Sequence, residues 1–495
     1  MDVIVGIAKF IVNNVLNQPA YLVGIITAIG LLALRRSIGQ VIGGGLKAAM
    51  GFLILGVGAA TVVSALEPLG KLILGATGAR GVVPTNEAVV ALAQEEFGAQ
   101  VAWVMIAGFV VSILLARFTP LKYVFLTGHH TFFMATLITA LLAIAELPAV
   151  WMIVVGAFLL GTIMVVMPAF TQPWTRRVTG GEDVAIGHFG SIGYIAAGTV
   201  GRVVGKRSKS TEDMKFPDGL KFLRDSMIAT ALSMVLIYTV FAVAMLGRVG
   251  KKEAFAVMDA TSVGDYIMAG VMQALLFGVG VAVILFGVRT ILGELVPAFN
   301  GIAAKVVPGA LPALDCPVVF PYAPNAVLIG FIASFTGGLA SLGILMAFDA
   351  PMGLALILPG MVPHFFTGGT AGVFGNATGG RRGAVVGGFV NGVIITFLPA
   401  LLLKVLGSLG LANTTFGDAD FGWFGLSVGY AVKLGSAGGI LVIALIVLVL
   451  LGGAIAFQRL VVVRGWNPAA AREAHFAEPG KDKEDAGPQS VSAAP

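Results

Sequence analysis

The stretch Gly293–Phe331, GELVPAFNGIAAKVVPGALPALDCPVVFPYAPNAVLIGF, decides how the whole chain is interpreted. It is apolar enough for the interior of a membrane protein, yet it holds prolines at positions 297, 308, 312, 317, 321 and 324. Proline lacks a backbone N–H and clashes with the preceding turn, so one straight helix cannot hold them all. Irregular backbone at membrane depth is stable only where it is buried in protein or lines a polar cavity. We therefore expect a broken, partly re-entrant segment that lines a binding site.

The composition of the chain places this segment in a membrane protein. Of its 495 residues, 57% are hydrophobic and only 11% are charged, whereas soluble domains carry about 25% charged residues. The net charge of +6 fits basic residues that gather on the cytoplasmic side of a membrane and gives no argument for nucleic-acid binding. The sequence therefore predicts an all-α polytopic membrane protein.

Hydrophobic runs divide the chain into two membrane halves. Eleven apolar spans are expected, near 20–34, 48–65, 100–115, 132–147, 149–170, 226–247, 264–288, 323–347, 350–366, 384–406 and 434–457. The longest polar stretch is rich in Lys and Arg, so the positive-inside rule puts it in the cytoplasm, the N-terminus outside and the C-terminus in the cytoplasm. Either 293–322 or 350–366 is also compatible with a re-entrant segment. The predicted division is an N-terminal membrane half (1–171), a cytoplasmic loop region (172–225), a C-terminal membrane half (226–465) and a disordered cytoplasmic tail (466–495).

Two short echoes indicate that the halves are related. GVVPTNEAVV (81–90) resembles VFPYAPNAVL (319–328), and LTGHH (126–130) resembles LPGMVPH (358–364). Interrupted hydrophobic segments at matching positions of two halves point to the binding site in many transporters. We therefore expect two weakly related halves around one site.

Polar side chains in apolar surroundings mark candidates for that site. Asn86 and Glu87 follow Pro84, although a solvent-facing loop explains them equally well. His129 and His130 precede an apolar helix, and His188 lies in the apolar patch AIGHFGSIGY. Adjacent helical residues point in different directions, so we expect one of the two neighbouring histidines to face the site.

The proline-rich segment supplies three further candidates, Glu294, Asp315 and Asn325. A carboxylate at membrane depth is costly unless it is partnered or functional. The glycine-rich run 363–382, PHFFTGGTAGVFGNATGGRR, predicts an irregular hairpin, and helix packing explains its glycines better than ligand contact does.

Several chemistries have no motif in this chain. No GxxxxGK[ST], HExxH or Cys/His cluster occurs, and Cys316 is the single cysteine. The sequence therefore predicts no catalytic residue, no cofactor and no metal site.

Several motifs resemble, in order, those of one transporter family. LTGHHTFF, the AIGH motif, GKRSKSTEDMKFPDGLKFLRDSMIATAL, GELVPAFNGI, the ALDC run with PYAPNAV, and LPGMVPHFF with GVFGN look like the ascorbate-specific permease subunits (IIC components) of the bacterial phosphotransferase system. The resemblance runs from about residue 15 to 465. It implies a homodimer in the bacterial cytoplasmic membrane, with core and scaffold domains, that works with cytoplasmic IIA and IIB proteins. These carry the phosphorylated histidine and cysteine, so Cys316 should not be phosphorylated.

The resemblance also implies which residues bind substrate. The family's pocket matches this chain at His129, His188, Asp315 and the pair Asn86–Glu87. This chain departs from the family at Phe133 and Phe189, where relatives carry glutamine, and at the Asn–Glu pair, where they carry Thr–Tyr. Buried hydrogen-bonding groups discriminate strongly between ligands. Ascorbate is therefore one expectation, and another sugar, sugar acid or polyol is the alternative within the family.

A different class of transporter also remains open at this point. A proton- or sodium-coupled secondary transporter would use Glu294 or Asp315 as its ion site.

Overall fold

The computed structural model describes residues 19–181, 184–206, 208–214, 226–348, 353–406 and 413–470, and these are almost entirely helical. Within these ranges, eight helices are long and apolar enough to cross a membrane. Two shorter apolar helices cover Val23–Leu32 and Gly128–Ala143. The prediction of an all-α polytopic membrane protein is confirmed, and the count of eleven spans stays a prediction.

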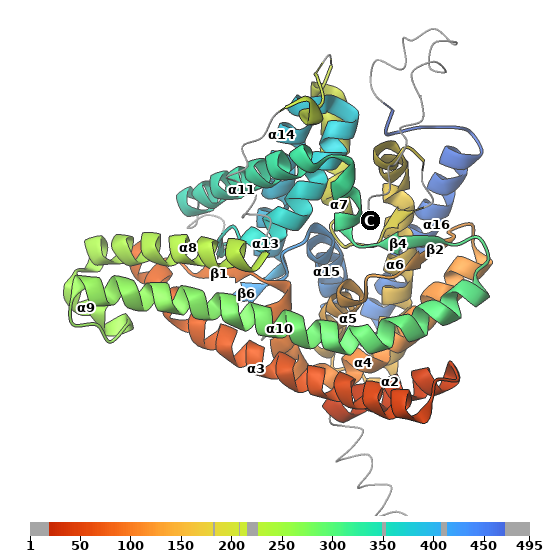
Figure 1. The fold of residues 1–495 in the computed structure, drawn as a ribbon, viewed down its shortest axis with the longest axis horizontal. Helices are drawn as coiled ribbons and strands as arrows, with labels where there is room; N and C mark the ends of the chain where they lie inside the picture. Colours follow the sequence, from red (N-terminus) through yellow and green to blue (C-terminus); the bar gives the residue numbers. More distant parts are fainter. Residues whose placement is uncertain are drawn as a thin grey trace, which may run out of the picture.

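Five helices form a first group, which we call the α10 group. It contains α2 (Pro19–Ala33), α3 (Ile38–Thr77), α8 (Ser226–Val249), α9 (Lys251–Val257) and α10 (Val263–Val306). The two long helices α3 and α10 lie side by side (Figure 1). A Cβ atom at Gly51 would lie only 2.8 Å from the carbonyl oxygen of Gly287, so glycine is what lets these backbones approach.

The remaining elements form a second group, which we call the sheet group. Its helices are α4 (Asn86–Phe118), α5 (Gly128–Ala143), α6 (Ala149–Thr179), α7 (Ser191–Val204), η2 (Thr211–Asp213), η4 (Cys316–Tyr322), α11 (Pro324–Ala347), α13 (Met361–Pro363), η5 (His364–Gly368), α14 (Gly369–Leu402), α15 (Ala419–Val432) and α16 (Ser436–Val462). Helix α14 packs against both α11 and α7, and α4 packs against α6 (Figure 1).

Two small parallel sheets give the second group its name. In one sheet, β1 (Gly81–Pro84) lies between β5 (Leu356–Ile357) and β6 (Thr414–Thr415). In the other, β4 (Leu311–Leu314) lies between β2 (Tyr123–Phe125) and β3 (Ala185–Ile186). Each sheet takes its central strand from one side of residues 215–225 and its outer strands from the other side. The relation between the two halves stays a prediction.

The proline-rich segment breaks later than the sequence suggested. Helix α10 continues through Pro297 to Val306, so the expectation of a break was wrong for residues 293–306. The chain then turns at Gly309 (φ 70°), forms β4 and the short η4 helix, and enters α11 at Pro324. In the second doubtful region, residues 353–366 contain β5 and the start of a helix in place of a membrane span.

The glycine-rich run 363–382 forms the predicted hairpin. Residues His364–Gly368 are a π-helix, and the backbone leaves helical geometry at Gly380 (φ 57°, ψ −148°). A Cβ atom at Gly375 would lie 2.2 Å from the carbonyl oxygen of Gly383, so the two arms are in direct backbone contact. Only glycine fits both the reversal and this contact.

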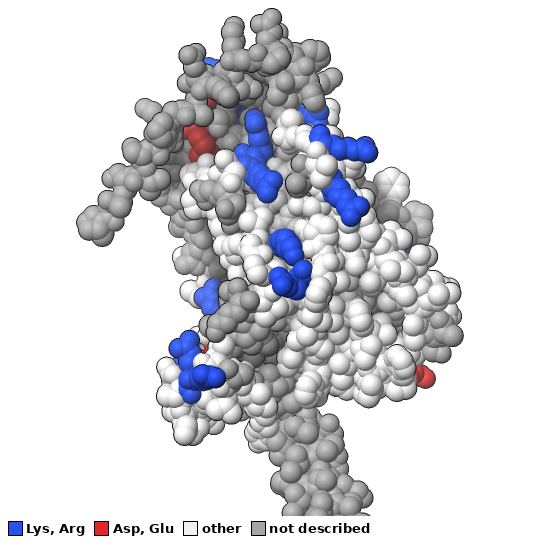
Figure 2. All heavy atoms as spheres, turned by 90° about the vertical axis from the view of Figure 1, so that its right-hand side faces the viewer, with Lys and Arg blue, Asp and Glu red and all other residues white. Residues whose placement is uncertain are grey.

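The predicted cytoplasmic loop region and tail are partly structured. Residues 172–179 complete α6, and residues 184–191, which include His188, are buried. Near the C-terminus, Ala469 is fully buried and the Pro468 carbonyl accepts a hydrogen bond from Arg202 at 3.2 Å. The tail from residue 471 onward lies outside the described residues. On the face shown in Figure 2, Lys and Arg side chains outnumber Asp and Glu side chains.

Candidate functional site

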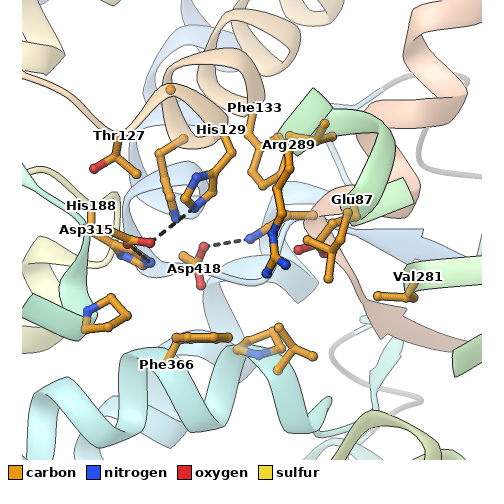
Figure 3. A pocket seen from close by; sticks show the side chains of 18 of the residues that line it. Glu87, Thr127, His129, Phe133, His188, Val281, Arg289, Asp315, Phe366 and Asp418 are labelled. Carbon is orange, nitrogen blue, oxygen red and sulfur yellow. Dashed lines mark hydrogen bonds and ion pairs between the residues drawn. The ribbon is translucent and has the colours of Figure 1, made fainter. Parts of the chain in front are cut away.

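A cavity of about 1020 Å³ lies between the α10 group and the sheet group. Helices α8 and α10 contribute Met227, Val281 and Arg289 to its lining. The sheet group contributes most of the polar side chains (Figure 3). The lining of this cavity therefore comes from both helix groups, which also share one hydrophobic core.

The ends of three strands place one polar cluster in this cavity. His129 follows β2, His188 follows β3 and Asp315 follows β4. Because the carboxyl ends of parallel strands meet at one edge of a sheet, the three side chains converge. His129 Nε2 lies 3.5 Å from Asp315 Oδ2, and His188 Nε2 lies 3.9 Å from Asp315 Oδ1 (Figure 3).

Asp315 and His129 form the accessible part of this cluster. Their side chains are 37% and 36% exposed, whereas that of His188 is 4% exposed. Asp315 Oδ1 accepts a hydrogen bond from the Cys316 N–H at 2.7 Å, which caps η4 and fixes the carboxylate. The Tyr194 hydroxyl contacts His188 Nδ1 at 2.7 Å and holds that ring with Nε2 toward Asp315. The histidine nitrogens lie no closer than 3.5 Å to the Asp315 carboxylate, so its oxygens remain available to a ligand.

The other sheet supplies a second polar cluster. Asn86 begins α4 after β1, and Asp418 follows β6. The Asn86 amide donates to Asp418 Oδ2 at 2.7 Å, and its oxygen accepts from the Gly417 N–H at 2.8 Å. Glu87, 7% exposed, lines the cavity beside this pair. The two sheets thus bring both clusters to one cavity.

Both neighbouring histidines line the cavity, although only one was expected to face the site. His130 is 3% exposed and accepts a hydrogen bond from the Phe189 N–H at its Nδ1, at 3.4 Å. Its ring lies 3.7 Å from that of His188 between centroids and is stacked on Phe421. His130 therefore forms a buried wall of the cavity behind the more accessible His129.

The two phenylalanines at positions where the resemblance implies glutamine, Phe133 and Phe189, have different surroundings. Phe133 lines the cavity. Phe189 is fully buried and stacks on Phe125, with ring centroids 4.9 Å apart, and it is absent from the described lining. The apolar surface at Phe133 is therefore the change that a ligand would meet.

Glu294 and Asn325 lie outside the described lining of this cavity. Glu294 forms an ion pair with Lys47 at 2.9 Å beside a smaller cavity of about 480 Å³. Asn325 donates to the Met214 carbonyl at 2.8 Å, and its N–H donates to Glu212 at 3.1 Å. These partners give both residues a structural explanation that needs no ligand.

The chain is similar to known proteins over most of its length. It matches the family described as the PTS system sugar-specific permease component (EIIC-GAT) over residues 14–420. This chain belongs to that family. A relative from Mycoplasma pneumoniae, the "Ascorbate-specific PTS system EIIC component", is 27% identical over 437 residues. The similarity covers 79% of this chain and 66% of the relative, so it spans slightly less than two thirds of the relative's length.

Two lining residues of this permease family member were missed by the sequence analysis. Arg289 stands directly after the predicted apolar span 264–288 and was not among the predicted site residues. Asp418 lies in the short segment TTFGDADFG before α15, which contains no long apolar span. An ionisable residue inside or beside an apolar helix is a functional-site hypothesis by itself, and that signal was available for Arg289.

The permease cavity also contains residues with metal-ligand chemistry. Ligand atoms of His130, His188 and Asp418 lie within 4.8 Å of one another. Each of these side chains already has a hydrogen-bond partner: Phe189, Tyr194 and Asn86 respectively. A network of this kind is suited to hydroxyl groups of a sugar, because imidazole and carboxylate groups supply both donors and acceptors.

Proposed function

We propose that this chain is the IIC permease subunit of a phosphotransferase system and translocates ascorbate or a similar sugar acid or polyol. Partner IIA and IIB proteins would phosphorylate the substrate as it is delivered inward. The chain itself would be a transport subunit that works as a homodimer in the bacterial cytoplasmic membrane.

The observation that carries this proposal is the convergence of His129, His188 and Asp315 at the ends of three parallel strands, in a chain of this family. The cluster lines a cavity of about 1020 Å³, at the upper end of the usual range for small-molecule sites. Hydrogen-bond acceptors and donors from both helix groups line this cavity. A polyhydroxylated ligand satisfies such an arrangement better than an apolar one does.

The position of Cys316 supports the assignment of phosphoryl transfer to other subunits. Cys316 is fully buried, and its Sγ lies 3.8 Å from the Phe366 carbonyl oxygen. A cysteine that receives a phosphoryl group from a partner protein must be accessible to that protein.

Uptake measurements test the proposal directly. The chain is expressed in two bacterial strains that differ only in phosphoenolpyruvate-dependent phosphotransfer, and a panel of labelled sugars, sugar acids and polyols is supplied. We expect accumulation of the phosphorylated substrate only in the strain with phosphotransfer. Uptake that follows a proton or sodium gradient in both strains would overturn the proposal in favour of a secondary transporter.

A further inference from the structure

Arg289 is the one lysine or arginine among the described residues that line the large cavity. It lies on α10, in the α10 group, whereas the carboxyl groups of the cavity come from the sheet group. Its side chain is exposed and lines the cavity, and in the view of Figure 3 it extends between Asp418 and Glu87. Arg289 therefore reaches the site from the opposite wall.

The charges of the cavity are unbalanced around this arginine. Glu87, Asp315 and Asp418 present three carboxyl groups. Asp418 already binds the Asn86 amide, and Asp315 lies between two histidines. Within the described part of the chain, Arg289 has no hydrogen-bond or ion-pair partner. A guanidinium on an apolar helix is costly to keep without a partner, so its presence needs a reason.

We propose that Arg289 binds a negatively charged oxygen of the substrate and thereby selects anionic sugar derivatives over neutral ones. The inference rests on the proposed function and adds the substrate's charge to it. In a cavity that carboxyl groups line, a facing cation is the group that favours an anionic ligand over a neutral one. Guanidinium fits this task because its planar donors bind two anionic oxygens or one oxygen by two N–H groups.

The placement of Arg289 also gives the bound anion a second effect. A ligand held by Arg289 on one side and by Asp315 and His129 on the other would bridge the two helix groups. The neutral hydroxyls of the ligand would face the sheet group, and its charge would face α10. Charge recognition and closure of the cavity would thus use the same contact.

A matched pair of ligands tests the inference on the purified full-length chain. The anionic probe is ascorbate, and the neutral probe is its methyl ether at the hydroxyl that ionises. We expect Arg289→Gln to weaken ascorbate binding roughly ten- to hundred-fold, as for loss of a hydrogen bond to a charged group. The ether should change by less than about threefold. Arg289→Lys should keep part of the preference, and Arg464→Gln, at an exposed arginine outside the described lining, should change neither probe.

Equal losses for both probes in Arg289→Gln, or no loss for either, would overturn the inference. A third outcome concerns the proposed function alone. If the wild-type chain binds neither probe, ascorbate is the wrong substrate, and the uptake panel identifies the right one. An anionic substrate from that panel would support the role of Arg289, and a neutral substrate would refute it.

Discussion

Replacing Asp315 by asparagine should weaken substrate binding without unfolding the permease. The carboxylate accepts one short hydrogen bond, from the Cys316 N–H at 2.7 Å, and the two histidine nitrogens stay 3.5 and 3.9 Å away. Its remaining acceptor positions face the cavity and can bind substrate hydroxyls. Asparagine keeps the side-chain oxygen that caps η4, so the local backbone should be preserved.

The magnitude follows from the difference between charged and neutral acceptors. A hydrogen bond to a charged group contributes about 1.5–3 kcal/mol, and one between neutral groups about 0.5–1.5 kcal/mol. Losing the charge at one or two substrate contacts should therefore weaken binding roughly ten- to hundred-fold. Asp315→Ala should abolish measurable uptake, since no acceptor remains.

Calorimetric binding and thermal unfolding on the same purified protein check this reasoning. Asp259→Asn, at an exposed acid outside the described cavity lining, is the matched control and should change neither quantity. Unchanged affinity in Asp315→Asn would remove the carboxylate from the site. A lower melting temperature with unchanged affinity would assign it a purely structural role.

Three other substitutions test separate parts of the structure. Asn86→Leu leaves the buried Asp418 without its 2.7 Å partner and should lower the free energy of unfolding by about 1–3 kcal/mol. In a double-mutant cycle of thermal unfolding, the Asn86→Leu, Asp418→Leu pair should lose less stability than the two single changes added together. Strict additivity would argue against the contact. Glu294→Gln breaks a largely exposed ion pair worth at most about 1 kcal/mol, so uptake should stay within about twofold, and its loss in a folded variant would revive the ion-site hypothesis. Gly375→Ala meets the Gly383 carbonyl and should destabilise the protein by about 1–3 kcal/mol, whereas Gly343→Ala, with open space around its Cβ position, should be neutral or slightly stabilising in the same melting assay.

The sequence by itself determined that this is a membrane protein, because the preference of a segment for the membrane depends on its own composition. A chain with 57% hydrophobic and 11% charged residues must bury most of its side chains in a membrane or in a very large core. The echo between 81–90 and 319–328 was visible in the sequence, and a long helix begins inside each segment, at Asn86 and at Pro324. The motifs LTGHH, AIGH and ALDC predicted His129, His188 and Asp315 as site residues, because this chain has the same residue types in those motifs as the family.

Only the tertiary structure decided which polar groups share one cavity. The strands that bring His129 to Asp315 are two to four residues long, too short for any periodicity to reveal. Asp418 meets Asn86 across 332 positions of sequence through the pairing of β6 with β1, a contact that no local pattern encodes. The sequence predicted Glu294 as a possible site residue, but in the fold it pairs with Lys47, 247 positions away. Arg289 was not among the predicted site residues, because its place in the cavity depends on what α10 faces. Local composition fixes which segments enter the membrane, but the register between distant segments fixes the site, and that register exists only in the folded chain.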